Sequence, residues 1–359
     1  MVVADPVEVS STLPTSRIVG IDLARSLAML GMVIAHYAWP DGSPGPLNTI
    51  ATGVSGRAMP LFVLLGGVGV TILSERAARP DRALLIRAAI LYPVGVVLQE
   101  VTTFIAIILQ SYALLFVLAT LFRRLEQRLL MGLSVMFTLV GAWSYQVVGP
   151  QLDRFGGPSD LIDNPPAALW SLLFNGSYPL FPMASFFLVG MVLGRLDLRS
   201  TGLAGWLAGT GTVVGVAAVW LANALADGTG YDFDTRPADH SFSWTRLLDT
   251  TGHSEMPAWV LSATGTSVAV LGISLLVAPR LGGLIWPMVA LGQLALSFYV
   301  FQAVLVRFTP HPETTSLRQE FVTALAIYVG FMAFATVWRL RFRTGPLEAA
   351  LRVGSSSRR

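Results

Sequence analysis

Residues 17–39 of this chain read RIVGIDLARSLAMLGMVIAHYAW, an apolar run interrupted by the ionisable side chains of Asp22, Arg25 and His36. The run is close to the roughly 20 residues that an α-helix needs to span a bilayer. An ionisable side chain at membrane depth is costly unless it faces the interior of a helix bundle or a wet cavity. The stretch therefore predicts a membrane-spanning helix with one face turned toward an internal crevice.

The rest of the chain continues this apolar pattern. Of its 359 residues, 53% are hydrophobic and 13% charged, and the mean hydropathy is +0.64. A soluble domain carries about 25% charged residues. The sequence thus predicts an all-α integral membrane protein with about ten transmembrane helices. From the apolar runs and their charged or Gly/Pro boundaries we place these helices near 18–38, 58–75, 83–98, 101–121, 129–148, 179–194, 204–226, 257–278, 284–306 and 319–338.

Charge alternates between successive predicted loops. Carboxylates gather in one set of loops, and arginines gather in the other set and in the C-terminal tail. By the positive-inside rule this alternation places both the N- and C-termini in the cytoplasm. We expect residues 17–352 to form a single transmembrane domain, between a disordered cytoplasmic N-terminus (1–16) and a disordered tail (353–359). The arginine-rich short loops contain Arg76, Arg79, Arg82, Arg123, Arg124, Arg128, Arg195, Arg199 and Arg280.

Several classes of function find no support in the sequence. The chain has no cysteine and no lysine, and its formal net charge of +3 comes from arginine. No Cys/His spacing indicates a metal site, nothing resembles a Walker loop, and the basic residues lie at membrane edges. We therefore expect no metal, no bound cofactor and no nucleic-acid partner. The histidines at positions 240, 253 and 311 have no metal-ligand spacing, and we assign them no site.

The three ionisable residues of the first helix share one face. Arg25 and His36 are eleven residues apart, which puts them within about 20° in azimuth and about 16 Å apart along the axis. A fixed cation toward the cytoplasm suits an anionic group, and an imidazole deeper in the crevice suits a general base. The alternatives are an intrahelical ion pair between Asp22 and Arg25, and a His36 that only packs between helices.

The same spacing carries a resemblance to a known family. Arg25 and His36, in the run LARSLAMLGMVIAH (23–36), resemble the Arg-X10-His signature of integral-membrane acyltransferases. The run MPLFVLLGGVGVTIL (59–73) resembles the FFxxSG segment of that superfamily. The departure is Leu65, where acyltransferase family 3 usually has serine.

Further motifs resemble the branch that contains the catalytic domain of heparan-α-glucosaminide N-acetyltransferase and the YeiB-like proteins. They are RIVGIDLAR (17–25), GSYPL (176–180) with GMVLGR (190–195), LGQLALSFYVFQ (291–302) and FRTGPLEAALR (342–352). This resemblance implies transfer of an acyl group, with acetyl as the expected one, from cytoplasmic acyl-CoA to a hydroxyl or amine reached from the other side. It also implies that His36 is the base and that Arg25 helps to hold the donor.

Further residues are candidates for the same site. Arg79, Arg82 and Arg87 follow the second helix, where acyltransferase family 3 proteins carry an arginine motif linked with the donor. The alternative for each of them is ordinary anchoring at the cytoplasmic membrane edge. Arg57 is predicted on the outer side, where it binds an anionic acceptor or pairs with a carboxylate. Glu100, in a short outer turn, is a candidate to orient His36, or else a solvated turn residue.

The acceptor stays open between a glycan, a lipid-linked sugar and a small metabolite. Gln110, Tyr112, Tyr299 and Gln302 lie inside predicted spans, where hydrogen bonds between helices are the expected role. A transporter or channel for a small anionic solute is the alternative function, but the chain has no two-half repeat. A regulatory or scaffolding membrane protein is a third. The composition favours a multi-pass protein of a bacterial plasma membrane and leaves its oligomeric state open.

Overall fold

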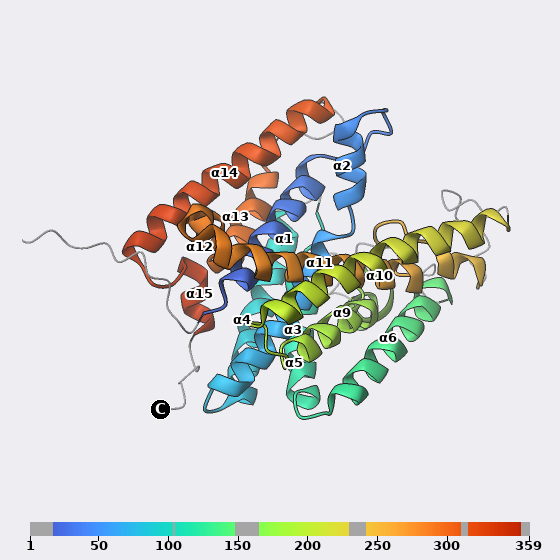
Figure 1. Cartoon of the computed structure of the whole chain (residues 1–359), viewed down its shortest axis with the longest axis horizontal. Coiled ribbons are helices and arrows are strands. Elements are labelled where there is room, and N and C mark those ends of the chain that lie inside the picture. The colour runs from blue at the N-terminus through green and yellow to red at the C-terminus, as the bar shows by residue number, and fades with distance from the viewer. Residues whose placement is uncertain (1–16, 103–104, 148–164, 230–241, 310–314, 353–359) are drawn as a thin grey trace, which may run out of the picture.

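A computed structural model describes residues 17–102, 105–147, 165–229, 242–309 and 315–352. In these ranges the regular structure is helical throughout, which confirms the all-α prediction (Figure 1). The ends expected to be disordered, 1–16 and 353–359, lie outside the described residues.

The main helices follow the predicted apolar runs. Seven helical stretches in the described residues are long and apolar enough to cross a membrane, and three shorter apolar helices accompany them. The chain is therefore a multi-pass membrane protein. The helices that match predicted runs are α1 (Val19–Tyr37), α3 (Ala58–Arg76), α4 (Pro80–Val101), α5 (Leu109–Phe122), α6 (Gln127–Val147), α9 (Leu180–Leu193), α10 (Thr201–Asp227), α11 (Pro257–Leu281), α12 (Trp286–Gln293) with α13 (Ala295–Val306), and α14 (Leu317–Arg341).

The structure departs from the predicted boundaries in two places. The run expected as one helix over 101–121 becomes helical only at Leu109. The run expected over 284–306 is broken at Leu294 into α12 and α13. Short helices were also missed because they are too brief to give a spanning apolar signal: α2 (Pro46–Val54), α8 (Pro165–Trp170) with a π-helical turn (Ser171–Asn175), and α15 (Pro346–Leu351).

Glycines set the closest helix crossings. A Cβ added to Gly190 of α9 would lie 1.9 Å from the carbonyl oxygen of Leu64 in α3, and one added to Gly292 of α12 would lie 1.9 Å from the carbonyl oxygen of Asp22 in α1. Small residues at such crossings let helix backbones approach closely, as is usual in membrane bundles. These contacts bring α9 against α3 and α12 against α1.

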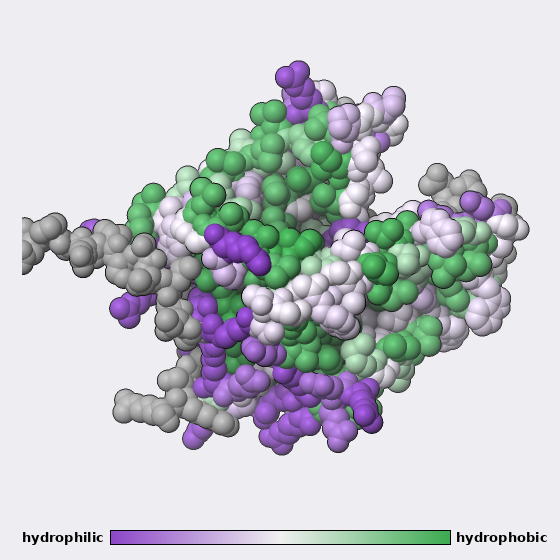
Figure 2. Space-filling view, viewed as in Figure 1, coloured by the Kyte–Doolittle hydropathy of each residue, from purple (hydrophilic) through white to green (hydrophobic). Residues whose placement is uncertain are grey.

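Polar contacts tie the arginine-rich connections together at one end of the molecule. Arg123, after α5, forms a bidentate ion pair with Asp81 at the start of α4. Arg195, after α9, donates to the carbonyl oxygens of Leu125 at 2.6 Å and Arg123 at 3.1 Å. Figure 2 shows hydrophilic side chains gathered along the lower edge of the view, beside these connections, and hydrophobic ones over much of the remaining face.

Contacts at the opposite end join the termini of other helices. The backbone N–H of Trp39, after α1, donates to the carboxylate of Glu320 at the start of α14 at 3.1 Å. The connection before α11 packs on the turn before α3, where a Cβ on Gly252 would lie 2.7 Å from the carbonyl oxygen of Ser55. α1 therefore runs from the arginine-rich end to an end built by the starts of α3, α11 and α14.

Candidate functional site

A cavity of about 480 Å³ opens beside the first half of α1. This volume is within the range of about 300–1,000 Å³ that is typical of ligand pockets. Its walls come from α1, α3, α4, α5, the α12–α13 break and the C-terminal segment after α14. Seven arginines and two carboxylates line it: Arg17, Arg25, Arg76, Arg87, Arg339, Arg343 and Arg352, with Asp22 and Glu348. We call it the arginine cavity, and its net positive lining suits an anionic ligand.

Asp22 organises one wall of the arginine cavity. Its side chain is 2% exposed and accepts two bonds from Arg17, at 2.5 and 3.0 Å, one from Arg25 at 3.2 Å and one from the amide of Gln293 at 3.2 Å. A buried carboxylate is stable only when it is paired and hydrogen-bonded in this way. The expected ion pair between Asp22 and Arg25 is therefore present, and it fixes the direction in which Arg25 points.

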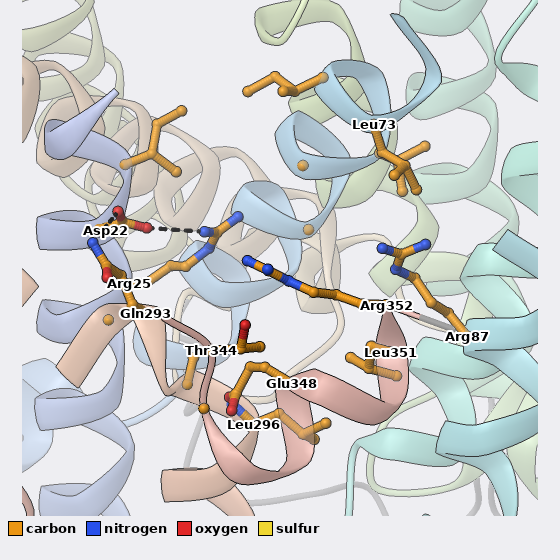
Figure 3. A pocket seen from close by; sticks show the side chains of 18 of the residues that line it. Asp22, Arg25, Leu73, Arg87, Gln293, Leu296, Thr344, Glu348, Leu351 and Arg352 are labelled. Atoms are coloured by element: carbon orange, nitrogen blue, oxygen red, sulfur yellow. Dashed lines mark hydrogen bonds and ion pairs between the residues drawn. The ribbon is translucent and has the colours of Figure 1, made fainter. Parts of the chain in front are cut away.

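Arginines reach into this cavity from opposite sides. Figure 3 shows Arg25 of α1 entering from one side, and Arg352, just after α15, entering from the other, with Arg87 of α4 beyond it. Two glycines of α3 leave room for neighbouring side chains at the cavity wall. A Cβ on Gly69 would approach the Arg25 guanidinium to 3.2 Å, and one on Gly66 would lie 2.2 Å from the Tyr112 hydroxyl.

Glu348 holds the C-terminal segment in place as a wall of the arginine cavity. Its carboxylate accepts from the backbone N–H groups of Leu296 at 2.8 Å and Ser297 at 3.0 Å, and from the Ser297 hydroxyl at 2.6 Å. The two N–H groups belong to the first turn of α13, where backbone donors have no acceptor within the helix. The break between α12 and α13 therefore serves as the docking point for α15.

His36 lines a second, smaller cavity of about 190 Å³ near the other end of α1. Its imidazole Nδ1 lies 3.0 Å from the side-chain oxygen of Gln302 in α13. The Tyr37 hydroxyl donates to the Gln302 carbonyl oxygen at 2.7 Å. Gln302 therefore contacts both His36 and Tyr37 of α1, and these contacts fix the orientation of the imidazole. We call this space the histidine cavity; its lining includes Met32, His36, Trp39, Tyr178, His253 and Tyr299.

Tyr299 belongs to the lining of both cavities. Its side chain is buried, and its hydroxyl accepts a bond from the backbone N–H of Ile108 at 3.1 Å. Arg25 therefore lines the arginine cavity and His36 the histidine cavity, and the Tyr299 side chain contributes to the wall of both. Eleven residues of helix separate Arg25 from His36, which corresponds to about 16 Å along the axis of α1.

Tyr178 contributes a hydroxyl to the histidine cavity. It precedes α9 and its ring meets that of His253 at a centroid distance of 5.8 Å. Burial, together with the nearby charge of Glu255, raises the pKa of Tyr178 to about 12. Tyr178 is therefore a neutral hydrogen-bond donor at physiological pH.

Other predicted site residues lie outside both cavity linings. Arg57 donates to the Ser262 hydroxyl at 2.7 Å and to the Thr250 carbonyl oxygen at 3.4 Å, so it bridges α11 and the connection before it. Arg79 and Arg82 are exposed at the start of α4, and Glu100 is exposed near its end. The hydrogen-bond partner of His36 is Gln302, rather than the carboxylate expected from Glu100.

Both cavities also include residues from distant parts of the chain whose role no sequence motif identifies. His253 was assigned no site, yet it lines the histidine cavity with His36, which precedes it by more than 200 residues. The arginines near the C-terminus were attributed to membrane orientation, yet Arg339, Arg343 and Arg352 line the arginine cavity. Leu65, at the serine position of the FFxxSG pattern, is fully buried against α1 and α9 residues and lines neither cavity.

Comparison with known proteins separates the two halves of the chain. Residues 17–219 match the model of the catalytic domain of heparan-alpha-glucosaminide N-acetyltransferase, and residues 240–358 match a family of proteins of unknown function, DUF418. No curated protein matches the chain. Both cavities draw residues from both matched regions, with Arg25 and His36 from the first and Arg352 and His253 from the second. The first match covers more than half of the sequence, and the chain therefore belongs to the family of the heparan-alpha-glucosaminide N-acetyltransferase catalytic domain, a family of membrane acetyltransferases.

Proposed function

We propose that this protein is a membrane-embedded acetyltransferase that moves an acetyl group from cytoplasmic acetyl-CoA to a hydroxyl or amine of an acceptor on the other side of the membrane. The acceptor is a glycan, a lipid-linked sugar or a small metabolite. The observation that carries the proposal is the shared wall at Tyr299, which puts an arginine-lined cavity and a histidine-lined cavity end to end along α1.

The arginine cavity is the proposed donor site. CoA carries several phosphate charges, and guanidinium groups recognise phosphate oxygens by paired, charge-assisted hydrogen bonds. Arg25, Arg87 and Arg352 enter this cavity from three different elements, so they can hold an extended anionic ligand at several points. Arg343 and Arg352 are exposed, which leaves this end of the cavity accessible to a soluble donor.

His36 is the proposed general base. With the amide oxygen of Gln302 facing Nδ1, that nitrogen carries the ring proton, and Nε2 keeps its lone pair. Nε2 takes the proton of the acceptor O–H or N–H as the acceptor oxygen or nitrogen attacks the thioester carbonyl carbon. The C–S bond then breaks, and the departing thiolate takes a proton from water on the donor side.

The orientation follows from the charge of the connections. The arginine-rich connections that Asp81 and Arg195 tie together belong on the cytoplasmic side by the positive-inside rule. In that orientation the arginine cavity opens to the cytoplasm and the histidine cavity lies toward the outer face. We place the protein in a bacterial plasma membrane, with ten spans and both termini inside, the three shorter apolar helices completing the seven long ones.

The decisive experiment measures donor consumption by the purified full chain in lipid nanodiscs. Acetyl-CoA is supplied with glucosamine as an amine probe and N-acetylglucosamine as a hydroxyl probe, and free CoA and acetylated product are quantified. We expect acceptor-dependent CoA release by the wild type, and a loss of about 100-fold or more in kcat for His36→Ala. Arg128→Ala, an exposed arginine outside both cavities, is the control for loss of charge.

The proposal is overturned if the wild type neither binds nor consumes acetyl-CoA, or if His36→Ala turns over at the wild-type rate. Flux of an anionic solute into proteoliposomes without CoA release would identify a transporter instead.

A further inference from the structure

A short connection between a 3-10 turn (Thr245–Leu248) and α11 carries a second histidine into the histidine cavity. The side chain of Asp249 accepts from the backbone N–H of Thr251 at 2.8 Å and from its hydroxyl at 2.6 Å. The Ser254 hydroxyl donates to the Asp249 carbonyl oxygen at 3.1 Å. The connection is therefore a compact, internally bonded turn, with His253 near its tip facing the cavity.

The backbone of this turn is strained at His253 and Glu255. His253 and Glu255 both have φ of 62°, and in the described residues they are the non-glycine residues with positive φ. Such conformations cost free energy and concentrate at functional sites, where the surrounding structure holds them in place. Gly252 packs against the turn before α3, and Arg57 donates to the Thr250 carbonyl oxygen. The fold thus holds His253 in one unfavourable but defined position.

His253 is paired with a buried carboxylate. Its Nδ1 lies 3.8 Å from Oε1 of Glu255, whose side chain is 2% exposed, whereas that of His253 is 38% exposed. This distance is long for a hydrogen bond, but such contacts often tighten once a substrate is bound. A carboxylate behind an imidazole stabilises the imidazolium that forms when the ring accepts a proton. The rings of Tyr178 and Trp259 lie against His253 and limit its rotation.

The two histidines of the cavity therefore have different supports. The neutral amide of Gln302 holds His36, whereas His253 stands beside an anion and is half open to its surroundings. A space of about 190 Å³ accommodates an acceptor group together with waters, each of which needs about 30 Å³. Among the described residues, the ionisable groups around His253 include Glu255 on its own turn, His36 of α1, Tyr178 before α9, Tyr299 of α13, and Arg57, which binds the Thr250 carbonyl oxygen.

We propose that His253, paired with Glu255, orients the acceptor in the histidine cavity and receives the proton that His36 removes from it. The proposal rests on the acetyltransferase function argued above. The acceptor O–H or N–H bond gives its electron pair to the new bond with the acetyl carbon, and its proton goes to His36. That proton passes directly or through water to His253 and then to solvent on the acceptor side, which restores His36 as a base. The CoA thiolate takes its own proton from water on the donor side.

The left-handed backbone makes a sharp test available. His253→Gly and His253→Asn both suit a φ of 62°, so neither adds strain, and neither replacement can accept a proton at neutral pH. We expect both variants to keep the wild-type Tm in detergent and the wild-type Kd for acetyl-CoA, and to lose about 100-fold in kcat with the acceptor that the wild type uses. Added imidazole should restore part of the kcat of His253→Gly and leave the wild type unchanged. Glu255→Gln should reduce kcat by a smaller factor than His253→Gly.

The outcomes separate this inference from the function on which it rests. If the wild type does not turn over acetyl-CoA, both the proposed acetyltransferase function and the proposed role of His253 are wrong. A wild type that turns over, with His253→Gly and His253→Asn at the same kcat, overturns the role of His253 and leaves the acetyltransferase intact. A low Tm with no response to imidazole in both variants shows a structural residue and also overturns it. The role of His253 is supported if His253→Gly keeps the wild-type Tm, has a reduced kcat, and regains part of that kcat when imidazole is added.

Discussion

Gln302 in α13 holds the imidazole of His36 in α1 through a contact of 3.0 Å, across 266 residues of sequence. This contact joins a residue of the acetyltransferase match to a residue of the DUF418 match. The proposed base is therefore complete only when both matched regions are folded together.

Replacement of Gln302 tests this dependence. Gln302→Leu keeps the volume of the side chain but removes the acceptor at Nδ1, so the imidazole loses its fixed tautomer and orientation. We expect kcat to fall about 10- to 100-fold, the loss typical of residues that orient a functional imidazole, with the Kd for acetyl-CoA unchanged. CoA release and equilibrium binding of acetyl-CoA are the two measurements. Tyr37→Phe, which removes only the bond to the Gln302 backbone, is the matched variant, and an equal loss of kcat in both would argue against the tautomer explanation.

The arginines divide into those inside and those outside the arginine cavity. Arg87→Ala and Arg352→Ala should each raise the Kd for CoA by roughly 10- to 100-fold, because a hydrogen bond to a charged group contributes about 1.5–3 kcal/mol. Arg79→Ala and Arg82→Ala remove the same charge from exposed positions outside the lining, so their effect should be small and should vanish at high salt. Isothermal titration with CoA at two salt concentrations checks this. Equal effects at all four positions would show that only the overall field matters.

The sequence predicts the helices well because each apolar run is a local signal. The ion pair of Asp22 with Arg25 and the placement of both beside a cavity follow from a three-residue spacing on one helix. His253 gives no comparable signal, because its position depends on a turn held by Asp249, Gly252 and the distant Arg57. For Glu100 the sequence signal is misleading, because a similar predicted depth in the membrane does not make two residues neighbours. The partner of His36 is Gln302 in α13, a helix that is far from α1 in sequence and packs against it in the fold.

The break at Leu294 has a similar cause. The run 284–306 is continuous in hydropathy, so composition alone predicts one helix. The structure starts a new helix there because Glu348, some 50 residues further on, supplies the oxygens for the exposed backbone donors. Because the capping residue belongs to another element, the sequence of 284–306 contains no signal for this helix break.

Tyr299 allows a test of whether its side chain separates the arginine cavity from the histidine cavity. Because it lines both cavities, Tyr299→Ala should open a path between them and admit water to the thioester. We expect acceptor-independent hydrolysis of acetyl-CoA to rise several-fold while acceptor-dependent transfer falls. Tyr299→Phe removes only the hydroxyl that accepts from Ile108, so it should keep hydrolysis low. Comparison of CoA release with and without acceptor separates these effects, and Tyr299→Ala with unchanged hydrolysis would mean that other side chains separate the two cavities.

Glu348 provides a prediction about stability and donor binding together. Its carboxylate accepts three hydrogen bonds at the start of α13, and Glu348→Ala leaves those donors unsatisfied, at a cost of about 1–3 kcal/mol. The same change frees α15, which carries Arg352 into the arginine cavity, so the Kd for CoA should rise with the fall in Tm. Glu126→Ala, at an exposed position before α6, is the matched control and should change neither quantity. A Glu348→Ala variant with a lower Tm but wild-type CoA affinity would show that the cap stabilises the bundle without positioning the donor site.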